Sequence, residues 1–305
     1  MHKGDITAEM VAGLVARQFP RWAGLPVTPV DLDGWDNTTF RLGATLSVRL
    51  PSADIYVPQI DKEHRWLARL APQLPLAIPE PVGRGEPEEA FPRPWSVYRW
   101  IEGATASPAT VGDPVVFAAD LAGFLGALYA CDTTGGPLAG GHSHNRGRPV
   151  AVWDASTRWA LDQIGSGVDT AGATEVWEAA LDAGACRRPV WVHGDVTGTN
   201  LLVAEGRLAA VIDFGCCAVG DPACDTTPAW TYFSGAGRRA FVDGLPLDGA
   251  TWARGRGWAL WKALIELVAE RDAPGHAERV ARRMGWCRGP AGVVAEVIAD
   301  HRAAS

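Results

Sequence analysis

The stretch VHGDVTGTN, residues 192–200, together with AVIDFG, residues 210–215, indicates the fold and the chemistry of this chain. Asn200 follows Asp195 by five residues, and Asp213 follows Asn200 by thirteen. Between them, NLLVAEGRLAAVIDFG places two short apolar runs on either side of Glu205-Gly206, which predicts a β-hairpin because glycine accepts a positive φ. Antiparallel pairing would bring Asn200, at the start of one strand, close to Asp213, at the end of the other.

A carboxamide and a carboxylate at one end of a hairpin offer only oxygen ligands, which suits Mg²⁺. Asp195, on the preceding loop, is expected near such an ion without binding it, as a general base. Phosphoryl transfer needs this combination, because a carboxylate accepts the hydroxyl proton while the metal bridges the phosphates. The alternative is that His193, Asp195, Asn200 and Asp213 are separate loop and cap residues. Their order, their spacing and the hairpin between them favour the phosphotransferase interpretation.

The first hundred residues predict a unit of mixed α and β structure. Apolar residues at helical spacing predict a helix over 7–19, and TTFRLGATLSVRLP predicts two antiparallel strands joined at Gly43. DKEHRWLARLAPQL, residues 61–74, has helical spacing, and WSVYRWIEG, residues 95–103, is rich in strand-forming residues.

From residue 112 onward the pattern is mainly helical. Asp113 and Pro114 form a cap and first turn for a helix over 113–132, and the Gly-rich stretch 133–149 predicts a long loop that contains His142 and His144. Further helices are predicted over 154–164, 174–183, 251–271 and 291–302.

The charge and the cysteines limit the partners. The net charge is −7, with 11 Lys/Arg against 13 Asp/Glu up to Gly103 and 17 against 22 beyond it. No basic cluster appears, which argues against nucleic acid, whereas the acidic second part suits a cationic small molecule or simply aids solubility. The six cysteines form no C-x-x-C pair and no membrane-spanning run is visible, so we expect a cytoplasmic protein without a membrane partner, as a monomer or weak dimer.

HGDVTGTN and IDFG, together with GDPACD (220–225), resemble the aminoglycoside phosphotransferase family, which consists of small-molecule kinases with a protein-kinase-like fold. The resemblance extends to GWDNTTFRLG, VRLP, WSVYRWIEG and most of 113–230. It implies an α+β, two-lobed fold. Residues 1–103 would form a small N-lobe with an antiparallel sheet that ends in the hinge strand, and 104–305 a larger, mainly helical C-lobe with the catalytic loop, the metal site and the acceptor site.

Carried over to this sequence, the resemblance makes Asp195 the catalytic base and makes Asn200 and Asp213 the Mg²⁺ ligands. His193 would organise the backbone of the catalytic loop, with direct proton transfer as the less favoured role. Asp221 and Asp225 would brace the catalytic and metal loops.

The resemblance also implies a nucleotide site in the first lobe. Arg49, in VRLP, stands where the family has a lysine that holds the α- and β-phosphates, and Glu63 is its expected helix partner. Arginine keeps the charge but differs in reach and geometry. Three hinge residues would contact the nucleobase, namely the carbonyl of Arg99, the amide of Ile101 and Tyr98 at the gate position. Weaker candidates for phosphate contact lie in the loop DGWDNTTF: Asn37, Thr38 and Thr39.

The predicted function is Mg²⁺-dependent transfer of the γ-phosphate of ATP or GTP to a hydroxyl of a small molecule, such as an aminoglycoside or a related antibiotic, in resistance or self-protection. One alternative is a metabolic kinase for choline, homoserine or a sugar. A quaternary ammonium such as choline would need an aromatic cage, for which Trp153, Trp159, Trp177 and Trp230 are candidates. The other alternative is a non-catalytic, kinase-like nucleotide-binding protein.

Overall fold

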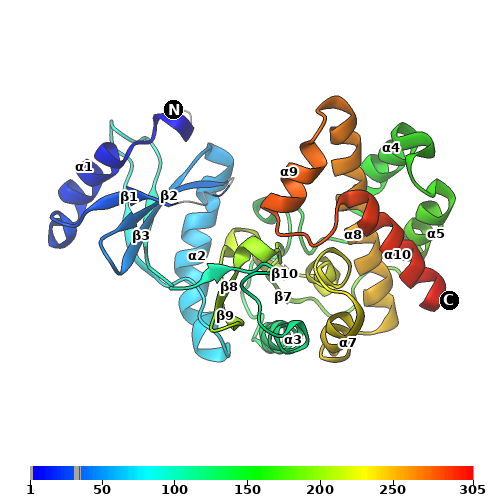
Figure 1. Cartoon of the computed structure of the whole chain (residues 1–305). Helices are drawn as coiled ribbons and strands as arrows, with labels where there is room; N and C mark the ends of the chain where they lie inside the picture. Colours follow the sequence, from blue (N-terminus) through cyan, green and yellow to red (C-terminus); the bar gives the residue numbers. More distant parts are fainter. Residues whose placement is uncertain (1–2, 31–33, 35, 305) are drawn as a thin grey trace. The chain divides into compact units, whose positions relative to one another are not determined.

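The computed structural model describes residues 3–30, 34 and 36–304, which form two compact units. The sheet unit comprises the described residues up to Gln73 together with Ala77–Glu102 and Asp213–Gly215. The helical unit comprises Leu74–Leu76, Gly103–Ile212 and the chain from Cys216 onward. Figure 1 shows the sheet unit in blue and cyan and the helical unit mainly in green to red.

The sheet unit is built on an antiparallel sheet with the strand order β1-β2-β3-β5-β4. Helices α1 (Ala8–Gln18) and α2 (Val57–Leu70) lie against this sheet (Figure 1). The strands are β1 (Val27–Pro29), β2 (Asn37–Leu42), β3 (Leu46–Pro51), β4 (Pro81–Gly85) and β5 (Trp95–Arg99).

The alternation of side chains along β3 and β5 separates the apolar core from a charged face. Val48 pairs with Val97, and both belong to the buried cluster that includes Leu14 and Val15 of α1. Directly paired residues share a face and successive residues alternate, so Arg49 lies on the opposite face of the sheet. The register therefore directs the arginine away from the core that α1 forms.

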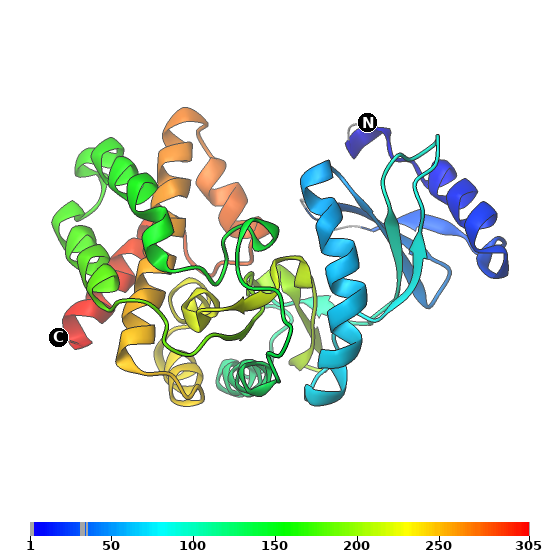
Figure 2. The same cartoon turned by 180° about the vertical axis from the view of Figure 1, so that it is seen from behind.

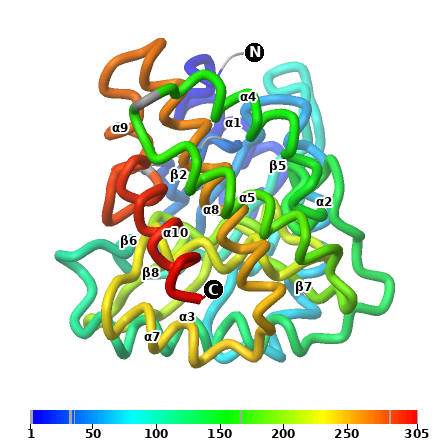
Figure 3. The backbone as a smooth tube through the Cα atoms, turned by 90° about the vertical axis from the view of Figure 1, so that its right-hand side faces the viewer, coloured from blue at the N-terminus to red at the C-terminus, as the bar shows by residue number. Residues whose placement is uncertain are grey.

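The helical unit is arranged around the long helix α8 (Gly249–Asp272). Helices α4, α5 and α10 pack around α8 (Figure 3), while α3 and α7 lie side by side (Figure 2). The other helices are α3 (Pro114–Ala130), α4 (Asp154–Ile164), α5 (Thr170–Asp182), α6 (Pro228–Thr231), α7 (Gly235–Asp243), α9 (His276–Arg283) and α10 (Pro290–Ala304). In the part of the chain that the structure describes, every helix is too short or too polar to cross a bilayer.

Two small sheets accompany these helices. One has the order β6-β8-β9 and the other pairs β10 with β7. The bounds are β6 (Ala104–Thr105), β7 (Val190–Val192), β8 (Leu201–Ala204), β9 (Arg207–Val211) and β10 (Ala218–Gly220). The predicted hairpin is confirmed: Leu201 pairs with Val211, and the turn residues Glu205 and Gly206 both have positive φ, 52° and 78°. A turn with two positive φ values matches the right-handed twist of the strands.

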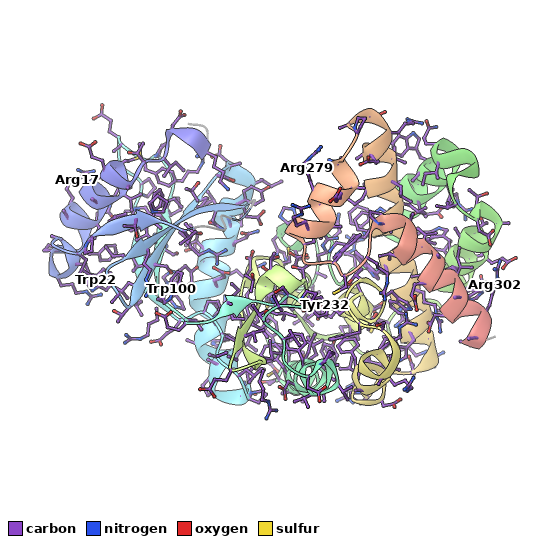
Figure 4. All side chains as sticks on the ribbon, viewed as in Figure 1. Arg17, Trp22, Trp100, Tyr232, Arg279 and Arg302 are labelled. Atoms are coloured by element: carbon purple, nitrogen blue, oxygen red, sulfur yellow. The ribbon has the colours of Figure 1, made fainter. Side chains whose placement is uncertain are left out.

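Short 3₁₀ helices connect the main elements. They span Lys3–Asp5, Pro20–Trp22, Asp54–Tyr56, Ala71–Gln73, Gly141–Ser143, Val150–Trp153, Gly165–Gly167, Gly198–Asn200, Phe214–Cys216 and Pro222–Thr226. Exposed ion pairs join some distant segments within each unit, such as Arg17 with Glu88 and Arg302 with Asp169; both arginines are labelled in Figure 4.

The α+β fold with an antiparallel sheet and a mainly helical remainder is confirmed, but several element boundaries differ from the predictions. Helix α2 begins at Val57 rather than at residue 61. Pro58 fits in its first turn, because the backbone N–H that proline lacks would have no partner within the helix at that position. Helices α7 and α9 were not predicted. Gly275 at the start of α9 has no side chain to cap this helix, so the usual start signal is missing; Glu270 of α8 accepts the first-turn N–H of Ala277 instead.

Asp113 is expected to contribute measurably to stability as the cap of α3. Its Oδ1 accepts hydrogen bonds from the backbone N–H of Val115 (2.7 Å) and Val116 (3.4 Å). Asp113→Ala should lower the free energy of unfolding by about 1 kcal/mol in urea titrations, because two helix donors lose their acceptor. Asp113→Asn should retain most of the stability, since asparagine also caps. Equal stability of the alanine variant and the wild type would contradict this role.

Candidate active site

Residues 193–200 form a loop between β7 and β8, and His193 fixes its backbone. The His193 side chain is fully buried, its Nδ1 accepts a hydrogen bond from the backbone N–H of Asp195 (3.2 Å), and its Nε2 lies 3.0 Å from the carbonyl oxygen of Ile212. Since Nδ1 is the acceptor, Nε2 carries the proton and donates to Ile212. His193 therefore connects the loop to the residue that follows β9.

Gly194 is required by the shape of this loop. Its φ is +84°, and a Cβ at this position would lie 2.8 Å from the carbonyl oxygen of Cys216 and 2.9 Å from the Cβ of Arg146. Both the backbone conformation and the available space exclude a larger residue. The glycine of the His-Gly-Asp motif thus has a structural cause.

Two buried aspartates of the GDPACD segment hold the loop in place. The carboxylate of Asp225 accepts hydrogen bonds from the backbone N–H of His193 (2.8 Å) and Gly194 (2.7 Å), and burial raises its pKa despite these donors. Asp221 accepts from the backbone N–H of Ala223 and pairs with the buried guanidinium of Arg254 at 2.6 Å. Both carboxylates therefore act on the backbone and the interior, as expected for bracing residues.

The carboxylate of Asp195 is held from two sides and still reaches solvent. Asn200 Nδ2 donates to Asp195 Oδ2 at 3.2 Å and to its backbone oxygen at 2.9 Å, while Lys262 Nζ lies 3.3 Å from Oδ1. The side chain of Asp195 remains 29% exposed, so a substrate hydroxyl can approach it. Burial opposes ionisation, but the positive charges of Lys262 and Arg146 outweigh it and hold the pKa of Asp195 below its usual value.

Lys262, in α8, lies 67 residues after Asp195 and was not predicted from the sequence. Burial lowers its pKa, and the charge of Asp195 opposes that shift. No local motif surrounds Lys262, because its role arises from helix packing and not from a loop sequence. A charged residue within the strongly apolar run WALWKALIEL, residues 258–267, is the one signal that could have indicated it.

The residues predicted to bind a metal have suitable atoms. Both hydrogen bonds of Asn200 described above use its side-chain nitrogen Nδ2, which leaves the side-chain oxygen Oδ1 as the atom that can face a cation. The backbone N–H of Ile212 donates to the backbone oxygen of Asn200 at 2.9 Å, so the hairpin pairing continues to the residue just before Asp213. Asp213 itself has a φ of 64° and is grouped with the sheet unit.

Among the described residues, no three His, Cys, Asp or Glu side chains are grouped so that they could hold a metal ion. Mg²⁺ needs fewer protein ligands than that, because it retains water and takes phosphate oxygens. The pair Asn200 and Asp213 has the oxygen chemistry for such an ion and stays a prediction.

In the sheet unit, Arg49 contacts two carboxylates. Its Nη1 lies 3.6 Å from Glu63 Oε1, its Nη2 donates to Asp213 Oδ1 at 3.1 Å, and the hydroxyl of Tyr98 donates to the other oxygen of Glu63. Burial alone would lower the pKa of Arg49, but the two carboxylates outweigh burial and raise it. Burial raises the pKa of Glu63 and of the Tyr98 hydroxyl. Arg49 and Glu63 are thus adjacent, as the comparison with the family implied.

The remaining nucleotide candidates occupy several positions of the same unit. Ile101 follows β5, and the exposed Arg99 side chain pairs with Glu80 at 3.1 Å. Asn37 and Thr38 begin β2, and Thr38 pairs with Leu50, which places its side chain on the face of the α1 core and away from Arg49. Any contact of Thr38 with phosphate would therefore use its backbone. Residues 33 and 35 of the loop DGWDNTTF lie outside the described residues.

The four tryptophans considered for an aromatic cage are not equivalent. Trp177 and Trp230 are fully buried, and Trp177 Nε1 donates to Asp154 at 2.7 Å. They are core residues, which is a correction to their candidacy as cage walls, because a ligand cannot reach them. Trp159 is 49% exposed and Trp153 is partly buried.

In the loop before α4, His142 Nε2 lies 2.8 Å from the carbonyl oxygen of Leu138.

Comparison with known proteins gives a family match and a consistent fold. The family model described as "Phosphotransferase enzyme family" matches residues 27–258. The GDP complex of aminoglycoside 2′-phosphotransferase-IIIa is similar, with a TM-score of 0.73 and 16% identity over 97% of this chain and 100% of that one. No curated protein sequence matches the chain significantly.

Two further solved structures share the fold at low identity. The streptomycin–ATP ternary complex of APH(2″)-IIa has a TM-score of 0.60 and 17% identity over 91% of this chain and 96% of that one. Macrolide 2′-phosphotransferase MphH from Brachybacterium faecium has a TM-score of 0.59 and 22% identity over 90% of this chain and 98% of that one.

Replacing Lys262 is expected to raise the pKa of Asp195. Lys262→Met removes the strongest cationic partner of this carboxylate, so protonation of Asp195 should begin at a higher pH. A ¹³C NMR titration that follows the Asp195 side-chain carboxyl would measure the change without an acceptor. Lys262→Arg keeps the charge and should shift the midpoint less. A midpoint that is unchanged or lower in Lys262→Met would show that the ammonium does not control this carboxylate.

Proposed function

The chain belongs to the phosphotransferase enzyme family, and we propose that it transfers the γ-phosphate of ATP or GTP to a hydroxyl group of a small molecule. The observation that carries this proposal is the Asp195 carboxylate, which is ionised, partly exposed and oriented by Asn200 and Lys262. Similar folds are titled as complexes with GDP, ADP or ATP, which supports a nucleoside triphosphate as the donor.

Asp195 would align the acceptor hydroxyl and accept its proton as the phosphorus–oxygen bond forms. Its lowered pKa keeps it ionised at neutral pH and makes it a modest base. A modest base suffices, because phosphoryl transfer has a loose transition state in which positioning and electrostatics provide most of the rate enhancement. His193, with its protonated Nε2 directed at Ile212, would keep the loop backbone in shape and not carry the proton.

Asn200, through its carbonyl oxygen, and Asp213 would hold Mg²⁺, which when bound neutralises charge on the β- and γ-phosphates. Arg49 would bind the α- and β-phosphates, with Glu63 holding the guanidinium in position. The guanidinium carries several donors in one plane, so it can keep a carboxylate partner and still offer N–H groups to phosphate. The backbone of Arg99 and Ile101, beside Tyr98, would bind the nucleobase.

Several chemical classes of small molecule carry a hydroxyl that could accept the phosphate. An aminoglycoside or another antibiotic is one class, since relatives of this fold are titled as aminoglycoside and macrolide phosphotransferases. A cytoplasmic location and a monomeric or weakly dimeric state complete the proposal. The location is inferred from the sequence, in which no run of apolar residues is long enough to span a membrane.

The direct test is incubation of the protein with Mg²⁺ and either ATP or GTP, alone and with a panel of hydroxyl compounds, followed by mass spectrometry. We expect release of nucleoside diphosphate that stops when EDTA removes the metal, and a phosphate gain on the true acceptor. Asp195→Ala should lower kcat by about 10³-fold, because the aligned base is lost, while nucleotide affinity changes little. A variant that keeps more than a few per cent of the wild-type kcat would refute the role of Asp195.

Arg49 is expected to govern nucleotide affinity. Arg49→Met should weaken binding of Mg²⁺–ADP by about tenfold in calorimetry, because a charge-assisted contact to phosphate is lost. The affinity of Arg49→Lys for Mg²⁺–ADP should lie between those of the wild type and Arg49→Met, since an ammonium keeps the charge but lacks the planar set of donors of the guanidinium. Arg17→Met, on the exposed surface of α1, serves as the control. Equal affinity of Arg49→Met and Arg17→Met would exclude a phosphate contact at Arg49.

A further inference from the structure

The surroundings of Asp195 in the helical unit are positively charged. Lys262 Nζ lies 3.3 Å from its carboxylate, and the Cβ of Arg146 lies close to the neighbouring Gly194, where an added Cβ would approach it to 2.9 Å. Lys262 is 11% exposed, and the buried Nε of Arg146 has no hydrogen-bond partner among the described residues. A bound molecule whose hydroxyl reaches Asp195 therefore meets the Lys262 ammonium, on a loop that packs against Arg146.

Two tryptophan rings lie near the guanidinium of Arg146. The guanidinium of Arg146 lies 5.5 Å from the ring centroid of Trp261, and Trp153 stacks on Trp261 with the centroids 4.0 Å apart and an angle of 20°. Trp153 and Trp261 are only partly buried, unlike Trp258 beneath them, which is 1% exposed. Two indole rings that still reach solvent can pack against a flat or apolar face of a bound molecule.

The carboxylates nearest to Lys262 along α8 are already engaged. Glu266, one helical turn on, lies 2.8 Å from His276 Nε2. Glu270 accepts hydrogen bonds from the backbone N–H of Gly275 and Ala277, each at 2.6 Å, where α9 begins. These contacts place both acids at the junction of α8 and α9, so they do not form an acidic surface around Asp195.

Helix α9 adds further positive charge close to the loop. Its sequence, HAERVARR, contains three arginines and one glutamate, and Figure 4 shows Arg279 extending outward from it. The carbonyl of Met284, which ends this helix, accepts a hydrogen bond from the backbone N–H of Gly198 at 3.1 Å. The arginine-rich helix is thus anchored on the same loop that carries Asp195.

We propose that the acceptor is uncharged or anionic and presents a flat or apolar face to Trp153 and Trp261, an inference that rests on the proposed function. A polycationic acceptor such as an aminoglycoside would have to bring ammonium groups close to Lys262, and like charges at short distances repel strongly when water is partly excluded, so the proposal narrows the acceptor classes given above. The acidic net charge of residues 104–305 suggested a cationic acceptor. That charge is spread over the whole region, whereas the charged group that contacts Asp195 is the Lys262 ammonium.

Matched glycosides test the charge preference. Phenyl glucuronide, phenyl glucoside and phenyl glucosaminide share one skeleton and differ in carrying a negative, a neutral or a positive group. In calorimetry with Mg²⁺–ADP present, we expect the glucuronide to bind about tenfold or more tightly than the glucosaminide, with the glucoside between them. Methyl glucuronide should bind more weakly than phenyl glucuronide, because it lacks the aromatic face.

Variants of Lys262 and Arg146 test whether these two side chains cause the preference for the anionic glycoside. Lys262→Met and Arg146→Met should each reduce the ratio of glucosaminide to glucuronide dissociation constants several-fold. Arg271→Met removes an exposed charge from the last turn of the same helix and should leave the ratio unchanged. Circular dichroism of each variant confirms folding before comparison.

Three results would overturn the inference: glucosaminide binding at least as tight as glucuronide binding, no binding of any of the glycosides, or variants that weaken nucleotide binding while the ratio stays constant. The last result would assign the two cations to the nucleotide phosphates. Release of ADP or GDP without an acceptor, lost in Asp195→Ala, tests the phosphotransferase proposal separately. Active release without the charge preference would therefore refute only the acceptor class.

Discussion

The buried carboxylate of Asp225 is the contact on which the candidate site depends. It accepts hydrogen bonds from the backbone N–H groups of His193 and Gly194. Gly194 has a left-handed conformation that no helix or strand provides, so these donors need a side-chain acceptor. His193 then bonds to the N–H of Asp195 and to the carbonyl of Ile212. One carboxylate thus fixes the loop, and the loop fixes the direction of the Asp195 side chain.

The setting of Asp195 also defines the kind of base it can be. Two opposing effects act on it, since burial disfavours the charge while Lys262 and Arg146 favour it, and the cations prevail. A carboxylate of low basicity orients a hydroxyl well and takes its proton late, which suits a transition state with little bond formation to the nucleophile. Lys262, which helps to keep Asp195 ionised, lies 3.3 Å from the carboxylate that the proposed acceptor hydroxyl would approach, so base strength and acceptor charge are coupled here.

In the sheet unit, the strand register has a comparable role. The pairing of Val48 with Val97 commits one face of β3 to the apolar core, and Arg49 is directed to the other face, toward Glu63 and Asp213. The guanidinium contacts both carboxylates through separate nitrogens, so Arg49 links the helix that carries Glu63 to the segment that holds Asp213.

The sequence by itself determined the local features that depend on near neighbours in the chain. These are the hairpin after Asn200 with its Glu205-Gly206 turn, the Asp113 cap of α3 and the strands around Gly43. It also indicated the family through the residues from His193 to Asp225, because their chemistry requires fixed spacing within one short segment.

Only the tertiary structure revealed Lys262 beside Asp195 and Arg146 against Gly194, and it alone separated the solvent-reaching Trp153 from the buried Trp177 and Trp230. Helix α9 also escaped prediction, since Gly275 at its start cannot cap it and the cap comes from Glu270 in another helix. Charges that act through space, and the burial of a ring, depend on how distant helices pack, and no periodicity within a single segment encodes that packing.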